Sequence, residues 1–468
     1  MARPYPNHPQ LRGNFAPIRM ECDVPDLIIQ GELPQDLNVT YYRNGPDPQF
    51  PPRGAHHWFG GDGMIHRFHV QNGRVSYNNR WMRTVKWKLE HEAGEALFSA
   101  FNPMENDPSV AGMETDGLAN TNVVWHGGKL LALEEGHAPF AVDPDTLESH
   151  GAWTFEDKLE GPMTAHPKMD PKTGEMLFFG YMADGPFSKG ISYQVVNSDG
   201  ELTRSERFDA PFASMVHDFI TTDEHVIFPI FPLTGSLERA MKGQPAYAWE
   251  PDKGTHIGIM PRDGSVADIR WFETDPCYVF HPMNAYTDGN RIVAHVMQFE
   301  EAPLFPHLDG SKPDPKKANA RLCEWEFDLG DNSNQVKRTY LDDITGEFPR
   351  LDERFAGNGY RHGYYAASTS HDGGGGFDAV VHHEFQKGDK ELYALPNGDR
   401  TGEPVFVPRS EQAADGEGYL LTTVYRSAEN RSDLAIFDAE NVAAGPIACA
   451  ELPHRVPHGF HGNWKYND

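Results

Sequence analysis

Short apolar runs separated by tight turns recur along the whole chain. The stretch NVVWHGGKLLALEEG (122–136) has a Gly-Gly pair between two apolar runs, and YVFHPMNAYTDGNRIVAHVMQF (278–299) turns at Thr-Asp-Gly-Asn. This pattern predicts β-hairpins. Because the residues on both sides of each turn are apolar, the strands are expected to be buried on both faces. Three further hairpins are predicted at 163–182, 215–232 and 419–440.

The hairpins follow one another at intervals of roughly 45 to 65 residues, which is typical of propeller blades or solenoid units. The 45 Gly and 37 Pro are spread along the chain, and this predicts many turns and short strands. Few segments favour a helix; one is GSLERAMKG (235–243). No linker divides the sequence, so residues 1–468 are expected to form a single all-β domain of propeller type, closed by N-terminal strands and the C-terminal segment.

Composition narrows the class of partner and the compartment. The formal net charge of −28 disfavours nucleic acid and anionic membranes as partners. The four cysteines stand far apart with no CxxC pair, which predicts reduced thiols rather than disulfides or a zinc site. The N-terminus lacks an apolar signal-peptide core, and no run of about 18 apolar residues is present. These features predict a cytoplasmic protein without a transmembrane segment.

Three of the 23 histidines share one context. His166, His217 and His281 each lie near the head of a hairpin's first strand, shortly before the turn. Equivalent positions in successive propeller blades point at the central axis, and three imidazoles on one axis would form a metal site. His461, in the terminal stretch RVPHGFHGNW (455–464), can supply a fourth ligand from the closing blade. Any single histidine is more often an ordinary surface or core residue, so the repeated context carries this inference.

Histidines alone leave the metal open. Structural zinc usually takes cysteine or carboxylate ligands as well. The two-histidine, one-carboxylate pattern of non-haem iron has the local form H-x-D/E, which occurs at residues 307–309 and 382–384. Both matches lie beside polar, turn-rich sequence and are interpreted as surface matches.

A series of longer motifs resembles the carotenoid cleavage oxygenase family, within it the lignostilbene dioxygenase and isoeugenol monooxygenase branch. The motifs follow the family's order over more than 400 residues of the 468-residue chain. They are YYRNGPDPQF (41–50), HHWFGGDGMIHRF (56–68), RWMRTVKW, ANTNVV, TAHPKMDP, VHDFITT, SLERAMKGQPAYAWEPDKGTHIGIMPR, FHPMNAY, GEFPRLDERFAG, EPVFVPRS and GFHGNW.

The resemblance implies a seven-bladed β-propeller with a loop and helix cap over the iron-bearing face. It also implies Fe(II) held by four histidines, with O2 as co-substrate and no organic cofactor. The implied ligands are His166, His217, His281 and His461, whereas His458 matches no ligand position. Family glutamates that accept the outer N–H of the ligand histidines map onto Glu134, Glu347 and Glu403, with Glu135 as the alternative to Glu134.

Family members cleave a conjugated C=C bond with O2 into two carbonyl products, which implies an aryl-alkene substrate of phenylpropenoid or stilbene type. Relatives in this branch bind the substrate's 4-hydroxyl with a Lys and a Tyr. Those positions match Leu133 and Phe101 here. A buried phenol without a partner costs about 1–3 kcal/mol, so weaker dependence on that hydroxyl is expected. Phe59 and Phe305 match pocket walls.

Two alternatives stay open. The same chemistry could act on a carotenoid or apocarotenoid, and the chain could be a non-catalytic propeller that binds a partner. The absence of a long amphipathic apolar patch favours a small aromatic alkene as the partner molecule. The sequence is compatible with a monomer or a homodimer.

Overall fold

The computed structural model describes residues 3–100, 102–370 and 376–467. Among them, α-helix is confined to α1 (Val85–Ala93) and α2 (Leu237–Met241), and α2 falls inside the predicted helical segment. The remaining regular structure is almost entirely β-strand, with short 3₁₀ turns, so the prediction of an all-β chain is confirmed. Helix α1 is capped at its N-terminus by Thr84, whose side chain accepts a hydrogen bond from the Trp87 amide, and at its C-terminus by Gly94, which has φ of 73°. These are ordinary capping arrangements.

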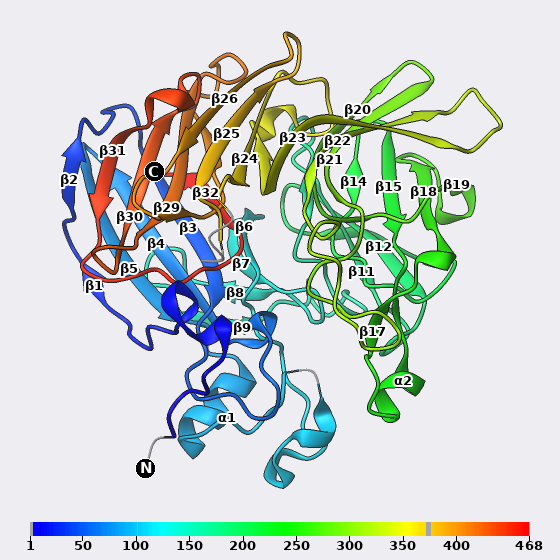
Figure 1. The fold of residues 1–468 in the computed structure, drawn as a ribbon, viewed down its shortest axis with the longest axis horizontal. Helices are drawn as coiled ribbons and strands as arrows, with labels where there is room; N and C mark the ends of the chain where they lie inside the picture. The colour runs from blue at the N-terminus through cyan, green and yellow to red at the C-terminus, as the bar shows by residue number, and fades with distance from the viewer. Residues whose placement is uncertain (1–2, 101, 371–375, 468) are drawn as a thin grey trace.

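The strands form separate antiparallel sheets arranged around the molecule (Figure 1). The first consists of β1 (Asp23–Val24), β5 (Arg74–Trp81), β4 (Gly63–Gln71), β3 (Val39–Pro46) and β32 (Gly462–Tyr466). The second consists of β6 (Asn122–His126), β7 (Lys129–Leu133), β8 (Phe140–Val142) and β9 (Ser149–Ala152). The third consists of β10 (Lys168–Met169), β11 (Met176–Tyr181), β12 (Gly190–Val196) and β13 (Leu202–Asp209).

The remaining sheets follow in the second half of the chain. One consists of β14 (Ile220–Thr221), β15 (His225–Ile230), β18 (Thr255–Pro261) and β19 (Arg270–Thr274). The longest consists of β20 (Tyr278–Asp288), β21 (Arg291–Phe299), β22 (Arg321–Asp328), β23 (Val336–Leu351), β24 (His362–Ser368), β25 (Ala379–Glu384) and β26 (Asp389–Ala394). Another consists of β2 (Ile28–Gly31), β31 (Pro446–Glu451), β30 (Arg431–Asp438), β29 (Gly418–Arg426) and β27 (Arg400–Thr401), with β28 (Val405–Pro408) also on β29. A small pair consists of β16 (Leu233–Gly235) and β17 (Tyr247–Trp249).

All five predicted hairpins are present, although two have very short first strands. The Gly-Gly turn joins β6 to β7 with φ of 54° at Gly127 and 71° at Gly128, the left-handed pair that a tight hairpin turn needs. By contrast, β10 and β14 contain two residues each. The chain ahead of these two strands is irregular, and His166 and His217 lie there.

Strands from the two halves of the chain pair with each other. Strand β32 pairs with β3 over five residue pairs, and β31 pairs with β2 over four. Figure 1 shows the red and blue strands of these sheets side by side. The segment that carries His461 is therefore held at both of its ends, because β31 precedes it and β32 follows it directly.

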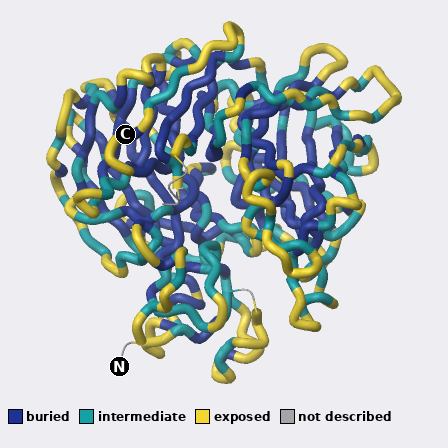
Figure 2. Tube along the Cα trace, in the orientation of Figure 1, coloured by how far each residue is buried: buried dark blue, intermediate teal, exposed yellow. Residues whose placement is uncertain are grey.

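The central strands of the sheets are buried on both faces, as the apolar runs predicted. Every residue of β11 and β12 is buried, whereas β13, at the edge of the same sheet, alternates half-buried and exposed positions. Figure 2 shows this arrangement, with buried strands inside and exposed residues in the connecting loops. The sheets thus pack face to face, and this packing fixes the position of the loops at their ends.

The N-terminal segment is attached through a buried carboxylate whose ionisation should affect stability. Asp47, 1 % exposed, accepts hydrogen bonds from the amides of Ile18 (2.9 Å) and Arg19 (3.2 Å). Burial raises the pKa of Asp47 from 3.8 to about 7, although the two amides oppose the shift. The folded chain therefore keeps this proton between these two pH values while the unfolded chain loses it, so stability falls as pH rises through this window.

The Asp47→Asn variant removes this titration. Its free energy of unfolding, relative to the parent, is expected to rise between pH 4 and pH 7 by up to roughly 4 kcal/mol and to stay constant above pH 7. A pH-independent loss from the missing acceptor oxygen is superimposed. Urea unfolding at several pH values measures the difference; a difference that does not change with pH would contradict the assignment. Asp343→Asn, at an exposed carboxylate, is the control.

Candidate metal centre

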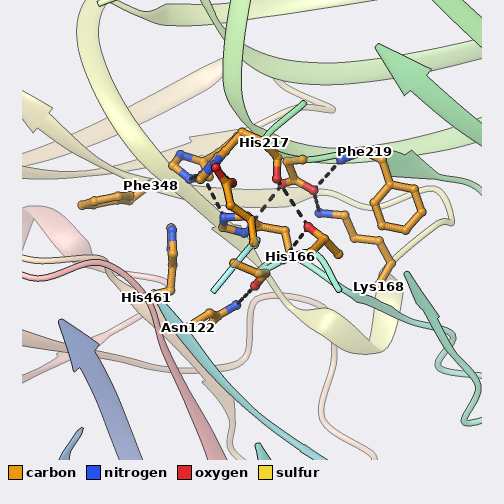
Figure 3. Close-up of polar contacts among 12 residues, drawn as sticks. Asn122, His166, Lys168, His217, Phe219, Phe348 and His461 are labelled. Carbon is orange, nitrogen blue, oxygen red and sulfur yellow. Dashed lines mark hydrogen bonds and ion pairs between the residues drawn. The ribbon is translucent and has the colours of Figure 1, made fainter. Parts of the chain in front are cut away.

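Four histidines from four separate parts of the chain meet at one buried point. The ligand atoms of His166, His217, His281 and His461 all lie within 4.8 Å of one another, and the four residues are 4–8 % exposed. The Nε2 atoms of His166 and His217 are 3.0 Å apart, and those of His217 and His281 are 3.2 Å apart. Figure 3 shows His166, His217 and His461 directed toward one another. The structure therefore brings these four histidines together, as the sequence predicted. Their role as metal ligands is a proposal.

Irregular backbone next to the sheets directs these side chains inward. His281 lies within β20 at a register shift of its pairing with β21, between Val279 and Pro282, and such bulges re-aim side chains near sites. The other three lie just before β10, β14 and β32. The amide of His166 donates to Thr164 Oγ1 (3.0 Å), and that of His461 donates to the Thr121 carbonyl (3.1 Å). These hydrogen bonds fix the backbone at positions where no pairing with a neighbouring strand holds it.

Three of the imidazoles are held from behind by carboxylates. His217 Nδ1 is 2.7 Å from Glu135 Oε2, and His281 Nδ1 is 2.6 Å from Glu347 Oε2. His461 Nδ1 is 2.9 Å from Glu403 Oε1. Each contact fixes the tautomer with hydrogen on Nδ1, so each Nε2 presents its lone pair to the centre. The prediction of Glu134 was wrong: its neighbour Glu135 makes this contact, and Glu134 contacts His137 instead.

His166 differs from the other three. The nearest carboxylate, Asp218 Oδ2, is 3.9 Å from His166 Nδ1, too far for a hydrogen bond. Asp218 is instead paired with Lys168 Nζ at 2.7 Å, and Figure 3 shows Lys168 beside Phe219. His166 is thus held mainly by its backbone and by packing.

Burial shapes the protonation of the cluster. Burial, together with the positive charge that neighbouring imidazoles would carry, lowers the pKa of His166 and His281 well below the ordinary value. Burial also lowers the pKa of His461, although Glu403 opposes the shift. Neutral imidazole is the form that binds a metal. Burial would raise the pKa of Glu403, but Arg350 and His461 outweigh it and lower the value to about 2.

The donor set fits a divalent transition metal. With the Nδ1–H groups of His217 and His281 facing carboxylates, their Nε2 atoms, 3.2 Å apart, are both acceptors and cannot satisfy one another. Two imidazole nitrogens at about 2.1 Å from one metal ion and at right angles to each other lie about 3.0 Å apart. Burial raises the pKa of Glu347 well above its usual range, and its Oε1 atom has no hydrogen-bond partner among the described residues. A cation at the centre would favour the ionised carboxylate.

A cavity of about 1690 Å³ opens onto the centre. Its wall includes Glu135 and three of the clustered histidines, His217, His281 and His461. Phe59 and Phe305 line it as predicted. Leu133 does not: it is 1 % exposed and packs in a core cluster with Leu131 and Phe178. The predicted cavity position of Leu133 was wrong, because strand alternation turns this residue of β7 into the core. Phe101 lies outside the described residues.

The remaining histidine predictions have mixed outcomes. His458 lines the cavity but lies outside the four-histidine group, as expected. The segment His382-His383-Glu384 is not at the surface: it lies in β25, with all three residues buried. His382 Nε2 is 2.8 Å from His362 Nδ1, and Glu384 Oε1 accepts from Arg361 Nε at 2.9 Å. Within the described residues, neither this segment nor His307 joins a metal-binding group.

Two side chains near the centre were not found from the sequence. Tyr181 Oη donates to Glu135 Oε1 at 2.8 Å, so it helps to hold the carboxylate that contacts His217. His137 follows the glutamate pair in the segment EEGH (134–137) and lines the cavity. Because this histidine lies so close to the two glutamates, it could have been found from the sequence, whereas no pattern in the sequence marked Tyr181, on β11.

The chain is similar to known proteins over nearly its whole length. Residues 15–466 match the family described as retinal pigment epithelial membrane protein. Isoeugenol monooxygenase of Pseudomonas nitroreducens is 39 % identical, covering 99 % of both chains. Lignostilbene-alpha,beta-dioxygenase isozyme III of Sphingomonas paucimobilis is 36 % identical, covering 98 % of this chain and 97 % of its own. The crystal structure of Pseudomonas brassicacearum lignostilbene dioxygenase superimposes with a TM-score of 0.95 at 35 % identity, covering 100 % of both chains.

Proposed function

The chain belongs to the retinal pigment epithelial membrane protein family, that of the carotenoid oxygenases, and from this premise we propose that it is a non-haem Fe(II) dioxygenase. It would use O2 to cleave the conjugated C=C bond of an aryl-alkene, of phenylpropenoid or stilbene type, into carbonyl products. The observation that carries the proposal is the four-histidine cluster, three of whose members line a large cavity. The similarity to an isoeugenol monooxygenase and a lignostilbene dioxygenase supports the substrate class.

The residues of the chain would each have a defined task. His166, His217, His281 and His461 would hold the iron, while Glu135, Glu347 and Glu403 would keep three of the rings in the binding tautomer. Bound iron would supply the position at which O2 reacts with the alkene. Phe59 and Phe305 would form walls that orient the substrate's ring and exclude water.

We propose that the sheets form the family's seven-bladed propeller within one domain spanning 1–468. Strand β23 pairs with β22 up to Tyr340 and with β24 from Thr345 onward, apart from one shared position at Thr345. The seven-stranded sheet would therefore count as two blades joined through one long strand. The pairing of β32 with β3 supports closure of the ring by the two ends.

A cytoplasmic location is a further proposal. It is supported by four free cysteines, of which three are buried, because reduced thiols are the rule in that compartment. None of the helices in the described segments has the length and apolar character needed to cross a membrane.

A second candidate substrate is an apocarotenoid. The cavity of about 1690 Å³ exceeds the ~300–1,000 Å³ typical of sites for small ligands, so a longer polyene could be accommodated. The same iron chemistry would serve both substrates.

One incubation tests the function and separates the two substrate classes. Iron-reconstituted protein is mixed in air with isoeugenol, 4-vinylguaiacol, anethole, resveratrol and one apocarotenal, and aldehydes are read by mass spectrometry. We expect aldehydes from the aryl-alkenes. Cleavage of the apocarotenal alone would favour the second substrate. No aldehyde from any compound, with iron fully bound, would refute both.

A further inference from the structure

A second, smaller cavity also reaches the four-histidine cluster. Its volume is about 130 Å³, which is large enough to hold several waters. Of the clustered histidines, His166 lines only this smaller cavity, and His217 lines only the large one. His281 and His461 line both. The cluster therefore lies between the two cavities, and the smaller one is called the rear cavity below.

The walls of the two cavities differ in chemistry. Phe280, Phe299 and Phe348 are among the aromatic residues that line the large cavity, whereas no described phenylalanine, tyrosine or tryptophan lines the rear cavity. An ion is costly to bury unless polar or charged groups surround it. The rear cavity provides such groups, with three carboxylates and two cationic side chains. These charged residues are Asp218, Glu353, Glu403, Lys168 and Arg350.

Carboxylates line the rear cavity from its exposed part to the cluster. The Glu353 side chain is 42 % exposed, whereas that of Asp218 is 4 % exposed. Asp218 Oδ1 contacts Lys168 Nζ at 2.7 Å and accepts from the Phe219 amide at 2.6 Å. Asp218 Oδ2 lies 3.9 Å from His166 Nδ1 and accepts no hydrogen bond in the described part of the chain. A buried carboxylate oxygen without a partner, next to the cluster, is a ready ligand for a cation.

His166 is the clustered ring that is easiest to turn. The other three rings are each held at Nδ1 by a carboxylate, from Glu135, Glu347 and Glu403. His166 Nδ1 forms no hydrogen bond with any described residue, and the bond to Thr164 Oγ1 holds only the His166 backbone amide. Rotation of this side chain therefore breaks no bond to a carboxylate. Because His166 lines the rear cavity, its rotation would open the cluster on that side.

We propose that the rear cavity is the route by which the metal ion enters and leaves the four-histidine centre. The ion would pass Glu353 and exchange bound water for Asp218 Oδ2, since oxygen ligands can replace the water that a cation sheds. It would reach the cluster while His166 is turned aside, and His166 would then close as the last ligand. This inference rests on the metal centre of the proposed function, and it leaves the large cavity to the alkene.

Rates of iron exchange test the route independently of turnover. Apo-protein is mixed with Fe(II) without O2, and a chromogenic chelator captures unbound iron at set times. The same chelator, added to iron-loaded protein, measures release. Ala356→Leu enlarges a half-buried residue of the rear-cavity wall. It is expected to slow uptake and release alike by about 10-fold and to leave the affinity unchanged, because an obstacle on the route raises the barrier equally in both directions.

A second variant tests the role of the buried carboxylate. Asp218→Asn keeps an acceptor for the Phe219 amide but removes the charge, and it is expected to slow uptake about 10-fold, because negative charge in a cleft attracts cations. The control is Ala246→Leu, the same substitution as at Ala356 but at a half-buried residue of the large cavity. It should exchange iron at the parent rates. Circular dichroism establishes that each variant is folded.

The outcomes separate the route from the proposed function. Parent exchange rates in Ala356→Leu, or equal slowing in Ala246→Leu, would overturn the route. A weaker affinity with an unchanged uptake rate in Ala356→Leu would overturn it as well, and a parent uptake rate in Asp218→Asn would overturn the part given to Asp218. If the parent binds no iron, the route and the oxygenase function both fail. Slowed exchange in Ala356→Leu, combined with no cleavage of any alkene in the panel, would support the route and refute the proposed function alone.

Discussion

Replacing His461 with alanine is expected to remove iron from the protein and to abolish alkene cleavage. The variant takes away one of four converging nitrogens at a site where His461 is 4 % exposed, and it leaves Glu403 without its imidazole partner. Loss of an outer partner of a metal ligand already costs about 10–100-fold in affinity or activity. Loss of the ligand itself should therefore exceed about 100-fold. Iron stoichiometry by atomic absorption and aldehyde formation by mass spectrometry measure the two effects.

The same terminal motif provides a matched control. His458 lies three residues earlier in the sequence and lines the same cavity, but it is outside the four-histidine group. His458→Gln is expected to bind iron in full. Full iron occupancy in the His461→Ala variant, or equal loss in both variants, would show that the position of His461 in the cluster is not what holds the metal.

The second large effect is expected at Glu347. Its Oε2 atom contacts His281 Nδ1 at 2.6 Å and accepts from the Phe348 amide at 2.6 Å, while Oε1 has no hydrogen-bond partner in the part of the chain that the structure describes. Glu347→Gln keeps the shape and an acceptor for His281 but removes the negative charge. Because that charge makes the imidazole a better donor to a cation, iron affinity is expected to fall about 10–100-fold. Competition with a calibrated chelator measures the affinity.

A second buried glutamate, which does not contact the clustered histidines, tests whether any buried Glu→Gln substitution would lower the iron affinity. Glu384 is 5 % exposed and is paired with Arg361, so Glu384→Gln perturbs a buried carboxylate without contacting a clustered histidine. Its iron affinity should match that of the parent. If Glu347→Gln binds iron as tightly as the parent, the carboxylate contributes to folding rather than to the metal centre.

Adjacent residues that look equivalent in the sequence can have different tasks in the structure. Glu134 and Glu135 are neighbours with the same side chain, and the family resemblance favoured Glu134. In the loop after β7 no strict alternation determines direction, so the path of the loop decides that Glu135 reaches His217 and Glu134 reaches His137. In the same way, Leu133, which precedes Glu134 and was expected on the cavity wall, lies in the core.

The sequence by itself determined the all-β class, the five hairpins and the four histidines that come together. These features depend on local patterns: apolar runs around turn residues, and a histidine repeated near the start of one hairpin after another. The family motifs supplied Glu347 and Glu403, each of which flanks a clustered histidine.

Only the tertiary structure decided which side chains meet across the sheets. It placed Glu135 and Tyr181 behind His217, buried His382 and His383 inside β25, and turned His137 toward the cavity. Each of these contacts joins residues whose orientations are set by loop paths and by packing between sheets. Such orientations depend on the free energy of the whole packed chain, so a local pattern of residues cannot specify them.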